Sequence, residues 1–301
     1  MNTQETNFDK TSPVLPIYIG CPVWNCEDWS NIVFPVGTKR PKWLGWYSQM
    51  FNCAEGNSSF YGIPSLETAR RWGAESANGF RFCMKFPREI SHDRALIGTE
   101  SKTSEFLLAI EELARADRLG PTFLQLGPNF GADRFDALAR FLSNLPREYP
   151  WGVEVRHLSW FDNAVNEQRL DELLQDLAID KVIFDSRPLN QTAPDDESEK
   201  QSQTRKPKTP LRTSVTGQHP MLRLIGRNRV ELVDSYLEEW VPIIDNWVTT
   251  GLQPHIFTHT PNDAFAPALA RRLWEKLRMV LPGNYDSLPL PPRQPRQLEW
   301  F

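Results

Sequence analysis

Two charged residues alternate with two valines in the segment WGVEVRHLSWF, residues 151–161. Successive side chains of an extended strand point to opposite faces, so Glu154 and Arg156 share one face and Val153 and Val155 the other. A carboxylate beside a guanidinium can bind part of a ligand, exchange a proton or simply form an ion pair. Which of these applies depends on the side chains that neighbouring strands place beside the pair.

Other short strands of the sequence also end in polar or charged residues. Every second residue, counted back from the end of each strand, lies on the same face. This parity predicts that the polar strand-end residues converge at one end of a parallel sheet. In the sixth strand it places Ile183, Asp185 and Arg187 on the inner face. The candidates for acid–base catalysis are Glu55, Glu154, Asp185 and His259. The candidates for ligand binding are Asn57, Tyr61, Lys85, His92, Gln125, Arg156, His157, Arg187, Arg223 and Arg227.

The elements that would position these residues alternate between strand and helix eight times. Strands are expected at residues 17–21, 52–57, 80–86, 121–126, 151–156, 181–185, 221–225 and 255–259. Amphipathic helices are expected at 42–49, 65–74, 101–120, 134–145, 166–177, 229–247 and 264–280. This alternation is typical of an α/β fold, a single (β/α)8 TIM barrel with eight parallel strands. A doubly wound open sheet would be expected to show a phosphate-binding glycine fingerprint after an early strand, and the sequence has none.

The chain divides into a barrel and two flanking segments. We expect a disordered N-terminal arm at residues 1–16, the barrel at 17–281 and a Pro-rich, extended C-terminal tail at 282–301. Residues 190–218 interrupt the alternation with a polar run, NQTAPDDESEKQSQTRKPKTP, that offers little apolar surface to bury. They are expected to form a mobile surface insertion that is dispensable for folding.

The composition of the 301 residues limits the partners and the compartment. There are 34 basic and 38 acidic residues, a net charge of -4, which argues against a broadly basic surface. The N-terminus is polar and no apolar run is long enough to cross a membrane, so neither a signal peptide nor a membrane anchor is expected. The four cysteines are expected to be reduced thiols in a cytoplasmic protein. The sequence does not indicate an oligomeric state.

Several motifs occur in a characteristic order: IGCPVWNCEDWSNIVFP, WYSQMFNCAEGNSSFYGIPS, FRFCMKFPREISH, FLQLGPNF, VEVRHLSWF, FDSRPL and HTPNDAFAPALARRL. In this order they resemble the YecE-like family, a bacterial family classified as domain of unknown function number seventy-two. The similarity extends over residues 17–281. It implies a TIM barrel, but it carries no established reaction. The first strand ends in GCP where many family members have GTSG, and residues 190–218 fall in a variable region.

The first functional hypothesis is a small anionic or phosphorylated ligand bound at the C-terminal mouth of the barrel. Barrels often bind phosphate through the loops after strands seven and eight, where Arg223 and Arg227 lie. The carboxylates and His259 then suggest a hydrolase acting on phosphate-containing substrates. A divalent metal is a less favoured addition, because the sequence shows neither an HxH pair nor a strict ligand spacing. No other cofactor is indicated.

Three other interpretations remain. One is a nucleic-acid or nucleotide-binding protein without catalysis, in which Trp24, Trp29, Phe60, Tyr61, Phe130 and Trp160 stack on bases. Another is a Schiff-base enzyme acting through Lys85, ranked last because nearby carboxylates would raise the pKa of this lysine. The third is a structural network of ion pairs, Glu55 with Lys85 and Glu154 with Arg156. Substituting Arg223 by leucine should be nearly neutral for folding if the cluster serves binding, and should cost about 3–5 kcal/mol if it is structural.

Overall fold

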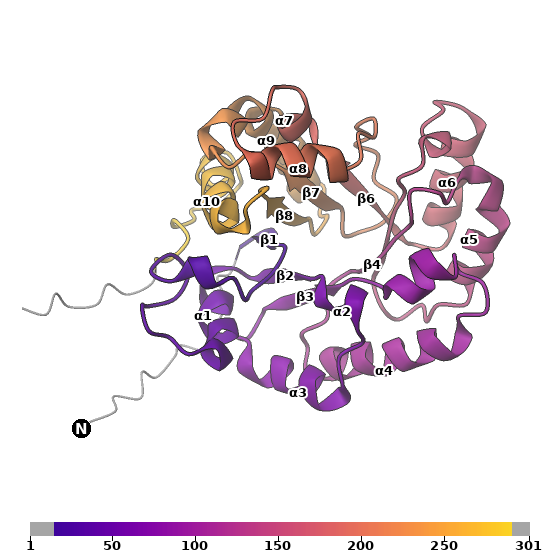
Figure 1. Ribbon diagram of the computed structural model, residues 1–301, viewed down its shortest axis with the longest axis horizontal. Helices are drawn as coiled ribbons and strands as arrows, with labels where there is room; N and C mark the ends of the chain where they lie inside the picture. Colours follow the sequence, from indigo (N-terminus) through magenta and orange to yellow (C-terminus); the bar gives the residue numbers. More distant parts are fainter. Residues whose placement is uncertain (1–14, 291–301) are drawn as a thin grey trace, which may run out of the picture.

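The computed structural model describes residues 15–290 and confirms the predicted barrel (Figure 1). Eight parallel strands form one sheet in the order β3-β2-β1-β8-β7-β6-β5-β4. The strands are β1 Tyr18–Cys21, β2 Cys53–Gly56, β3 Arg81–Met84, β4 Thr122–Gln125, β5 Trp151–Glu154, β6 Asp180–Asp185, β7 Met221–Ile225 and β8 His255–His259. Each lies where the sequence predicts a strand.

Helices connect successive strands and cover the outside of the barrel, as the crossover rule for parallel strands requires (Figure 1). They are α1 Trp43–Met50, α2 Ser58–Tyr61, α3 Leu66–Glu75, α4 Glu100–Arg115, α5 Phe135–Ser143, α6 Val165–Asp176, α7 Arg187–Asn190, α8 Glu197–Arg205, α9 Asp234–Thr249 and α10 Ala266–Leu277. The long helices match the predicted ones, and Ser65 caps α3 by accepting a hydrogen bond from the amide of Thr68. The short helices α2, α7 and α8 were not predicted.

The barrel closes between β3 and β4 through isolated bridges rather than a continuous ladder. Phe82 pairs with Leu119, and Lys85 pairs with Phe123. By contrast, β7 and β8 pair continuously along their whole length, residues 221–225 with residues 255–259. The β3–β4 seam is therefore held by fewer backbone hydrogen bonds than β7 and β8 are.

The interior of the barrel is filled by a layer of apolar side chains below the polar strand ends. This layer consists of Cys53, Cys83, Phe123, Val182, Met221 and Phe257. Close contact between β1 and β2 requires a glycine at position 20, since a Cβ there would lie 2.0 Å from the carbonyl oxygen of Cys53. The hydroxyl of Tyr47 accepts a hydrogen bond from the amide of Cys21 and donates one to the same carbonyl. The apolar layer below the polar strand ends is thus closely packed.

The insertion at residues 190–218 contains helix α8, which lies beside α7 (Figure 1). Glu199 of α8 is fully buried and receives hydrogen bonds from Arg227 and from the amide of Asn228. Thr216 accepts a hydrogen bond from the amide of Lys181 and donates one to the carbonyl of Ile179. The mobility of the insertion stays a prediction. Its polar contacts do not favour the expectation that it is dispensable for folding, because the buried Glu199 and Thr216 tie it to the barrel by hydrogen bonds.

The two flanking segments fall largely outside the described residues, which exclude 1–14 and 291–301. The described part of the C-terminal segment packs against α10: Arg271 donates to the carbonyl of Leu288 at 2.9 Å, and the Trp274 indole donates to the carbonyl of Asp286 at 2.8 Å. Within residues 15–290, no helix combines the length and the apolar character needed to cross a membrane. The four cysteines are free thiols.

Candidate functional site

Seven polar side chains from six strands and their C-terminal extensions meet above the apolar layer, and we call them the barrel-end cluster. Its members are Glu55, Lys85, Gln125, Glu154, Arg156, Arg223 and His259. All seven were predicted from strand parity, and the structure brings them together. The alternation of inner and outer positions in the short strands β2, β5, β7 and β8 is what places them there.

Arg223 lies at the centre of the barrel-end cluster and joins its two carboxylates. Its Nε and Nη2 donate to Glu55 Oε2 and Oε1 at 2.9 and 2.7 Å. Its Nη1 donates to Glu154 Oε2 at 2.5 Å. The guanidinium also lies 5.2 Å from the centre of the Phe123 ring. A fork that binds one carboxylate bidentately and reaches a second is a geometry that arginine provides and lysine does not.

Arg156 binds the other side of Glu154. Its Nε donates to Glu154 Oε1 at 2.6 Å, and its Nη2 donates to Gln125 Oε1 at 2.7 Å. Its guanidinium lies 5.5 Å from the centre of the Phe184 ring. Both oxygens of Glu154 are therefore bonded to arginine, while the Arg156 side chain remains partly exposed.

The two carboxylates stay ionised in this environment. Burial alone would raise the pKa of Glu55, but Arg223 and His259 outweigh it and hold the pKa well below its usual range. For Glu154 the same balance of burial against Arg156 and Arg223 lowers the pKa to about 2. Burial lowers the pKa of His259 to about 4, so its neutral ring donates from Nε2 to Glu55 Oε2 at 3.0 Å. Glu55 and Glu154 thus orient cations and are poor proton donors near neutral pH.

Lys85 does not form the expected ion pair with Glu55, because Arg223 occupies both oxygens of that carboxylate. Its Nζ instead lies 3.9 Å from the centre of the Phe60 ring. Burial and, next, the charge of Arg223 lower the pKa of Lys85 to about 7, although Glu154 acts in the opposite direction. The nearby carboxylates therefore do not raise the pKa of Lys85 as expected, because burial and Arg223 outweigh Glu154 and Glu55.

Lys206 was not predicted as a site residue, yet its ammonium lies within the electrostatic reach of the barrel-end cluster. It follows α8 in the insertion, and burial together with Arg223 and Arg156 lowers its pKa to about 8. The signal in the sequence was the basic run RKPK at the end of the polar insertion. Treating the insertion as a solvated loop concealed this residue.

Three predicted ligand-binding residues lie at the edge of the barrel-end cluster. Asn57 donates from Nδ2 to Glu55 Oε1 at 2.6 Å. His92 packs edge-on against the Phe60 ring with centroids 5.0 Å apart, and burial together with Lys85 lowers its pKa to about 4. Tyr61 is 84% exposed and packs edge-on with Phe60, with ring centroids 5.2 Å apart. Phe60 therefore links these two residues to Lys85.

The parity predicted for the sixth strand is wrong by one residue. Phe184 pairs with Arg223 of β7, so it is Phe184 that faces the interior. Asp185 points outward and accepts hydrogen bonds from the Trp240 indole and from Arg187, both at 2.9 Å. Arg187 continues outward to Glu239 of α9. A shift of one residue moves a whole strand face to the other side of the sheet, which removes Asp185 and Arg187 from the barrel-end cluster.

Two other predicted ligand-binding residues also lie elsewhere. Arg227 binds the buried Glu199 of the insertion, with Nη2 2.6 Å from Oε2, and also contacts Asp195 at 3.1 Å. His157 lies in the loop after β5, where its Nδ1 and the Ser159 hydroxyl are 2.8 Å apart. Within the described residues, neither side chain contacts a member of the barrel-end cluster, so the structure does not bring them to it, and a role in ligand binding stays a prediction.

The aromatic residues proposed to stack on bases are mostly buried. Trp24, Trp29, Phe60, Phe130 and Trp160 are all inaccessible or nearly so, and only Tyr61 presents its ring to solvent. The Trp29 and Trp160 indoles donate to the carbonyls of Asp263 and Phe130. These rings therefore pack loops onto the barrel and are not available as a stacking surface.

Metal binding finds no support in the side-chain arrangement of residues 15–290. No group of three or more His, Cys, Asp or Glu side chains in this range is placed to hold a metal ion. In the barrel-end cluster the guanidinium of Arg223 occupies the position between Glu55 and Glu154 that a cation would need. The two carboxylates already have their positive partner.

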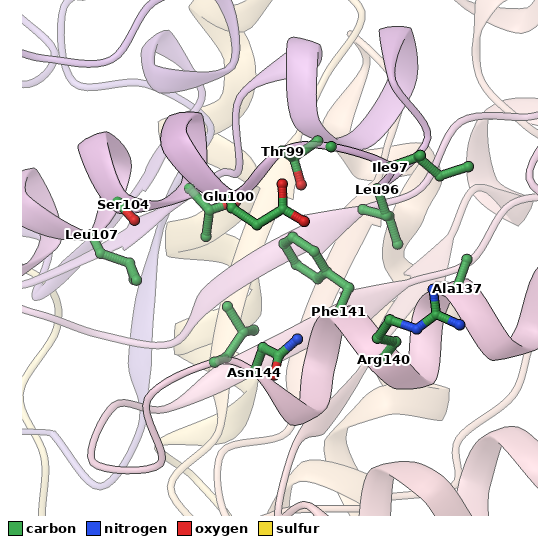
Figure 2. Close-up of a pocket in the computed structure, with 13 residues that line it drawn as sticks. Leu96, Ile97, Thr99, Glu100, Ser104, Leu107, Ala137, Arg140, Phe141 and Asn144 are labelled. Atoms are coloured by element: carbon green, nitrogen blue, oxygen red, sulfur yellow. The ribbon is translucent and has the colours of Figure 1, made fainter.

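A separate surface cavity of about 380 Å³ lies outside the barrel between α4 and α5. Figure 2 shows Glu100 and Ser104 on one wall, with Arg140, Phe141 and Asn144 on the other. Its lining is mixed and contains no member of the barrel-end cluster. We therefore assign the candidate site to the barrel end and not to this cavity.

Comparison with protein families places the whole barrel in one family. Residues 18–295 match the family described as "Protein of unknown function DUF72". This chain belongs to that family, as the resemblance noted in the sequence implies. Among its relatives is the UPF0759 protein YecE of Escherichia coli strain K12, 37% identical over 278 residues, which are 92% of this chain and 98% of the relative.

More distant relatives and solved structures agree with the fold. The UPF0759 protein YunF of Bacillus subtilis is 28% identical over 159 residues, about half of each chain. A crystal structure of a DUF72 family protein from Enterococcus faecalis has a TM-score of 0.63 at 18% identity and covers 94% of this chain and all of that one. One from Thermotoga maritima has a TM-score of 0.63 at 20% identity and covers 87% of this chain and 98% of that one. At such identities the likeness supports the fold alone.

Proposed function

We propose that this protein binds a small anionic ligand, carrying a phosphate or carboxylate group, at the barrel-end cluster. The observation that carries the proposal is a surplus of cations. The carboxylates of Glu55 and Glu154 are saturated by Arg223 and Arg156. Lys85 and Lys206 lie within reach of the same arginines and have no ion pair within the described part of the chain.

The balance of charge at this end of the barrel favours an anion. Besides the two carboxylates, Asp263 lies within electrostatic reach of Lys206; burial raises the pKa of Asp263, and the charge of Lys206 acts in the opposite direction. The four basic side chains still outnumber these three acids when all are charged. Cations crowded into a partly buried region lose hydration and repel one another, and an anion relieves both costs. Burial, followed by the charge of Arg223, lowers the pKa of both lysines below that of an exposed lysine.

We do not extend the proposal to hydrolysis by Glu55 or Glu154. Each of these carboxylates has both oxygens bonded to arginine and a lowered pKa, so each is a weak base toward water. Asp185, the third acid suggested for this role, lies on the outer face of β6. A hydrolase mechanism would need to pass its protons through His259 or a lysine instead.

The test is calorimetric titration of inorganic phosphate and malonate into the full chain at low salt. We compare wild type with Lys206→Ala and with Lys208→Ala, an exposed lysine of the same run. Removing Lys206 should weaken phosphate binding about tenfold, the effect of losing one charged hydrogen bond, and removing Lys208 should leave it unchanged. If the wild type binds neither anion, or if both variants bind as the wild type does, the proposal is wrong.

A nucleotide is a second candidate, favoured by the position of Tyr61. Its ring is exposed and adjoins Phe60, which in turn contacts Lys85. A base could stack on this ring while its phosphate meets the cations. If so, AMP should bind more tightly than inorganic phosphate, and Tyr61→Ala should remove the difference, because stacking is worth about 1–3 kcal/mol per base. Equal affinities for AMP and phosphate would exclude this candidate.

A further inference from the structure

We propose that Lys85 is a nucleophilic amine that forms an imine with a small aldehyde or ketone bearing a phosphate or carboxylate group. The inference rests on the proposed anion site, which would hold the charged end of such a compound beside the amine. Lys85 follows the last residue of β3, at the C-terminal end of the barrel where the catalytic groups of TIM-barrel enzymes are carried. It would add a covalent step to a site otherwise proposed only to bind.

The contacts of Lys85 leave its nitrogen available for reaction. Its side chain is only 7% exposed, and Phe60 covers it at 3.9 Å from Nζ to the ring centre. Among the described residues, no carboxylate or carbonyl accepts a hydrogen bond from this nitrogen. The nearby acids Glu55 and Glu154 are engaged by Arg223. The amine is therefore held in one place by packing and not by an acceptor that would keep it protonated.

A second buried lysine shows that this arrangement is not a general feature of the barrel. Lys181 is 5% exposed, comparable with Lys85. Its Nζ, however, donates to Asp171 Oδ1 at 2.7 Å and to the Ser214 hydroxyl at 3.3 Å. The Lys181 nitrogen thus has a carboxylate and a hydroxyl as hydrogen-bond partners, and within the described residues Lys85 has neither. The pair provides an internal control in the same molecule.

The charges around Lys85 support the neutral form of the amine. Burial, followed by Arg223, lowers its pKa to about 7, and Arg156 acts in the same direction. Glu154 and Glu55 act in the opposite direction and offset only part of the shift. An ordinary lysine has a pKa of about 10.4, so at neutral pH Lys85 carries far more of the neutral amine that attacks a carbonyl carbon.

The reaction is balanced without any further reagent. The nitrogen lone pair of Lys85 forms a bond to the carbonyl carbon while the carbon–oxygen π electrons move to oxygen. A proton passes from nitrogen to that oxygen and gives a carbinolamine. A second proton from solvent lets the hydroxyl leave as water, and the nitrogen electrons form the protonated imine. Solvent carries these protons, and His92 packs on the Phe60 ring with its Nδ1 2.8 Å from the Ser91 hydroxyl.

The experiment treats the full chain with pyridoxal 5′-phosphate as a phosphate-bearing aldehyde and traps the imine with sodium borohydride. Uncharged pyridoxal is the matched probe without the anion. Peptide mapping by mass spectrometry then locates the modified lysines in wild type, Lys85→Arg and Lys206→Arg. Circular dichroism establishes that each variant is folded. Wild type should be labelled at Lys85 and not at Lys181, with a rate that rises with pH and is half-maximal near the pKa of about 7.

The outcomes separate this inference from the proposed function. Labelling at Lys85 that is faster with the phosphate-bearing probe, and that inorganic phosphate suppresses, supports both. Labelling at Lys85 at equal rates with both probes supports the nucleophilic amine and removes the anion site. No labelling at Lys85 in a wild type that binds phosphate overturns the inference and leaves the anion site standing. Labelling at Lys206 alone, or a rate that rises only near pH 10, also overturns it.

Discussion

The buried arginines Arg223 and Arg227 lie close together in the sequence. The clusters around them differ in whether neighbouring cations lack acidic partners. In the barrel-end cluster Arg223 binds two carboxylates, and further cations crowd around it. In the Arg227 cluster, formed by Arg227, Glu199, Asp195, Thr192 and Asn228, the oxygens of Glu199 are matched by donors from Arg227 and from backbone amides. The barrel-end cluster and its surroundings hold more cationic than anionic side chains, and the Arg227 cluster does not. Burial of an arginine is therefore not itself a sign of function. Neighbouring cations without an acidic partner are such a sign.

Arg223→Leu should have the largest effect on stability. It removes the guanidinium that bonds to both Glu55 and Glu154 and leaves two buried carboxylates without it, so we expect a loss of about 3–5 kcal/mol. This is the outcome that the structural interpretation predicts for Arg223, and it does not exclude binding by the surrounding cations. Denaturant unfolding measures the loss, with the exposed Arg229→Leu as control. A loss below about 1 kcal/mol would show that the cluster is not a structural network.

Glu199→Ala should have an intermediate effect. It leaves Arg227 with Asp195 as its remaining acidic partner, so we expect a loss of about 2–3 kcal/mol, as for hydrogen bonds to a charged group. The exposed Glu197→Ala on the same helix is the matched control. If the insertion is mobile and dispensable, as its composition suggests, the two variants will unfold at the same denaturant concentration.

Lys85→Met should have the smallest effect and the opposite sign. Because the pKa of Lys85 is about 7 in the folded protein and about 10.4 when unfolded, the unfolded chain binds more protons between these values and wild-type stability rises with pH there. Methionine removes this cost, so the variant should be more stable by about 1 kcal/mol below pH 7, since the lost cation–π contact offsets part of the gain.

The gain from Lys85→Met should shrink as pH rises from 7 toward 10, where wild-type Lys85 is neutral in the folded protein. Chemical denaturation at pH 6, 7.5 and 9 measures it. Lys181→Met provides the contrast, because it removes a partner of Asp171 and should destabilise at every pH. A Lys85→Met variant less stable than wild type at pH 6 would mean that the ammonium is well satisfied.

Much of the fold could be predicted from the sequence because it depends on local patterns. Val153 and Val155 alternate with charges, and Ser65 begins a helix with a cap that its spacing signals. Strand parity then placed seven polar residues correctly. It failed at Asp185 because the inner face of β6 is occupied by the apolar Phe184, and a strand with apolar residues on both faces gives no parity signal.

Contacts between residues that lie far apart in the sequence could not be predicted. Arg227 and Glu199 find each other through the fold of the insertion, and no periodicity relates them. Lys206 reaches the barrel end for the same reason. The low pKa of Lys85 depends first on its burial and then on the nearby charge of Arg223, and both follow from the three-dimensional fold.

The open seam between β3 and β4 has a consequence for dynamics. Lys85 forms one of the isolated bridges across it, with Phe123. Segments with few backbone hydrogen bonds open locally at a lower free energy than the fully paired core, and their amides exchange with solvent sooner. Lys85, which directly follows β3, thus lies beside the part of the barrel that can open locally without global unfolding. A compound of modest size could reach the covered amine through such openings, on a timescale set by the protein and not by diffusion.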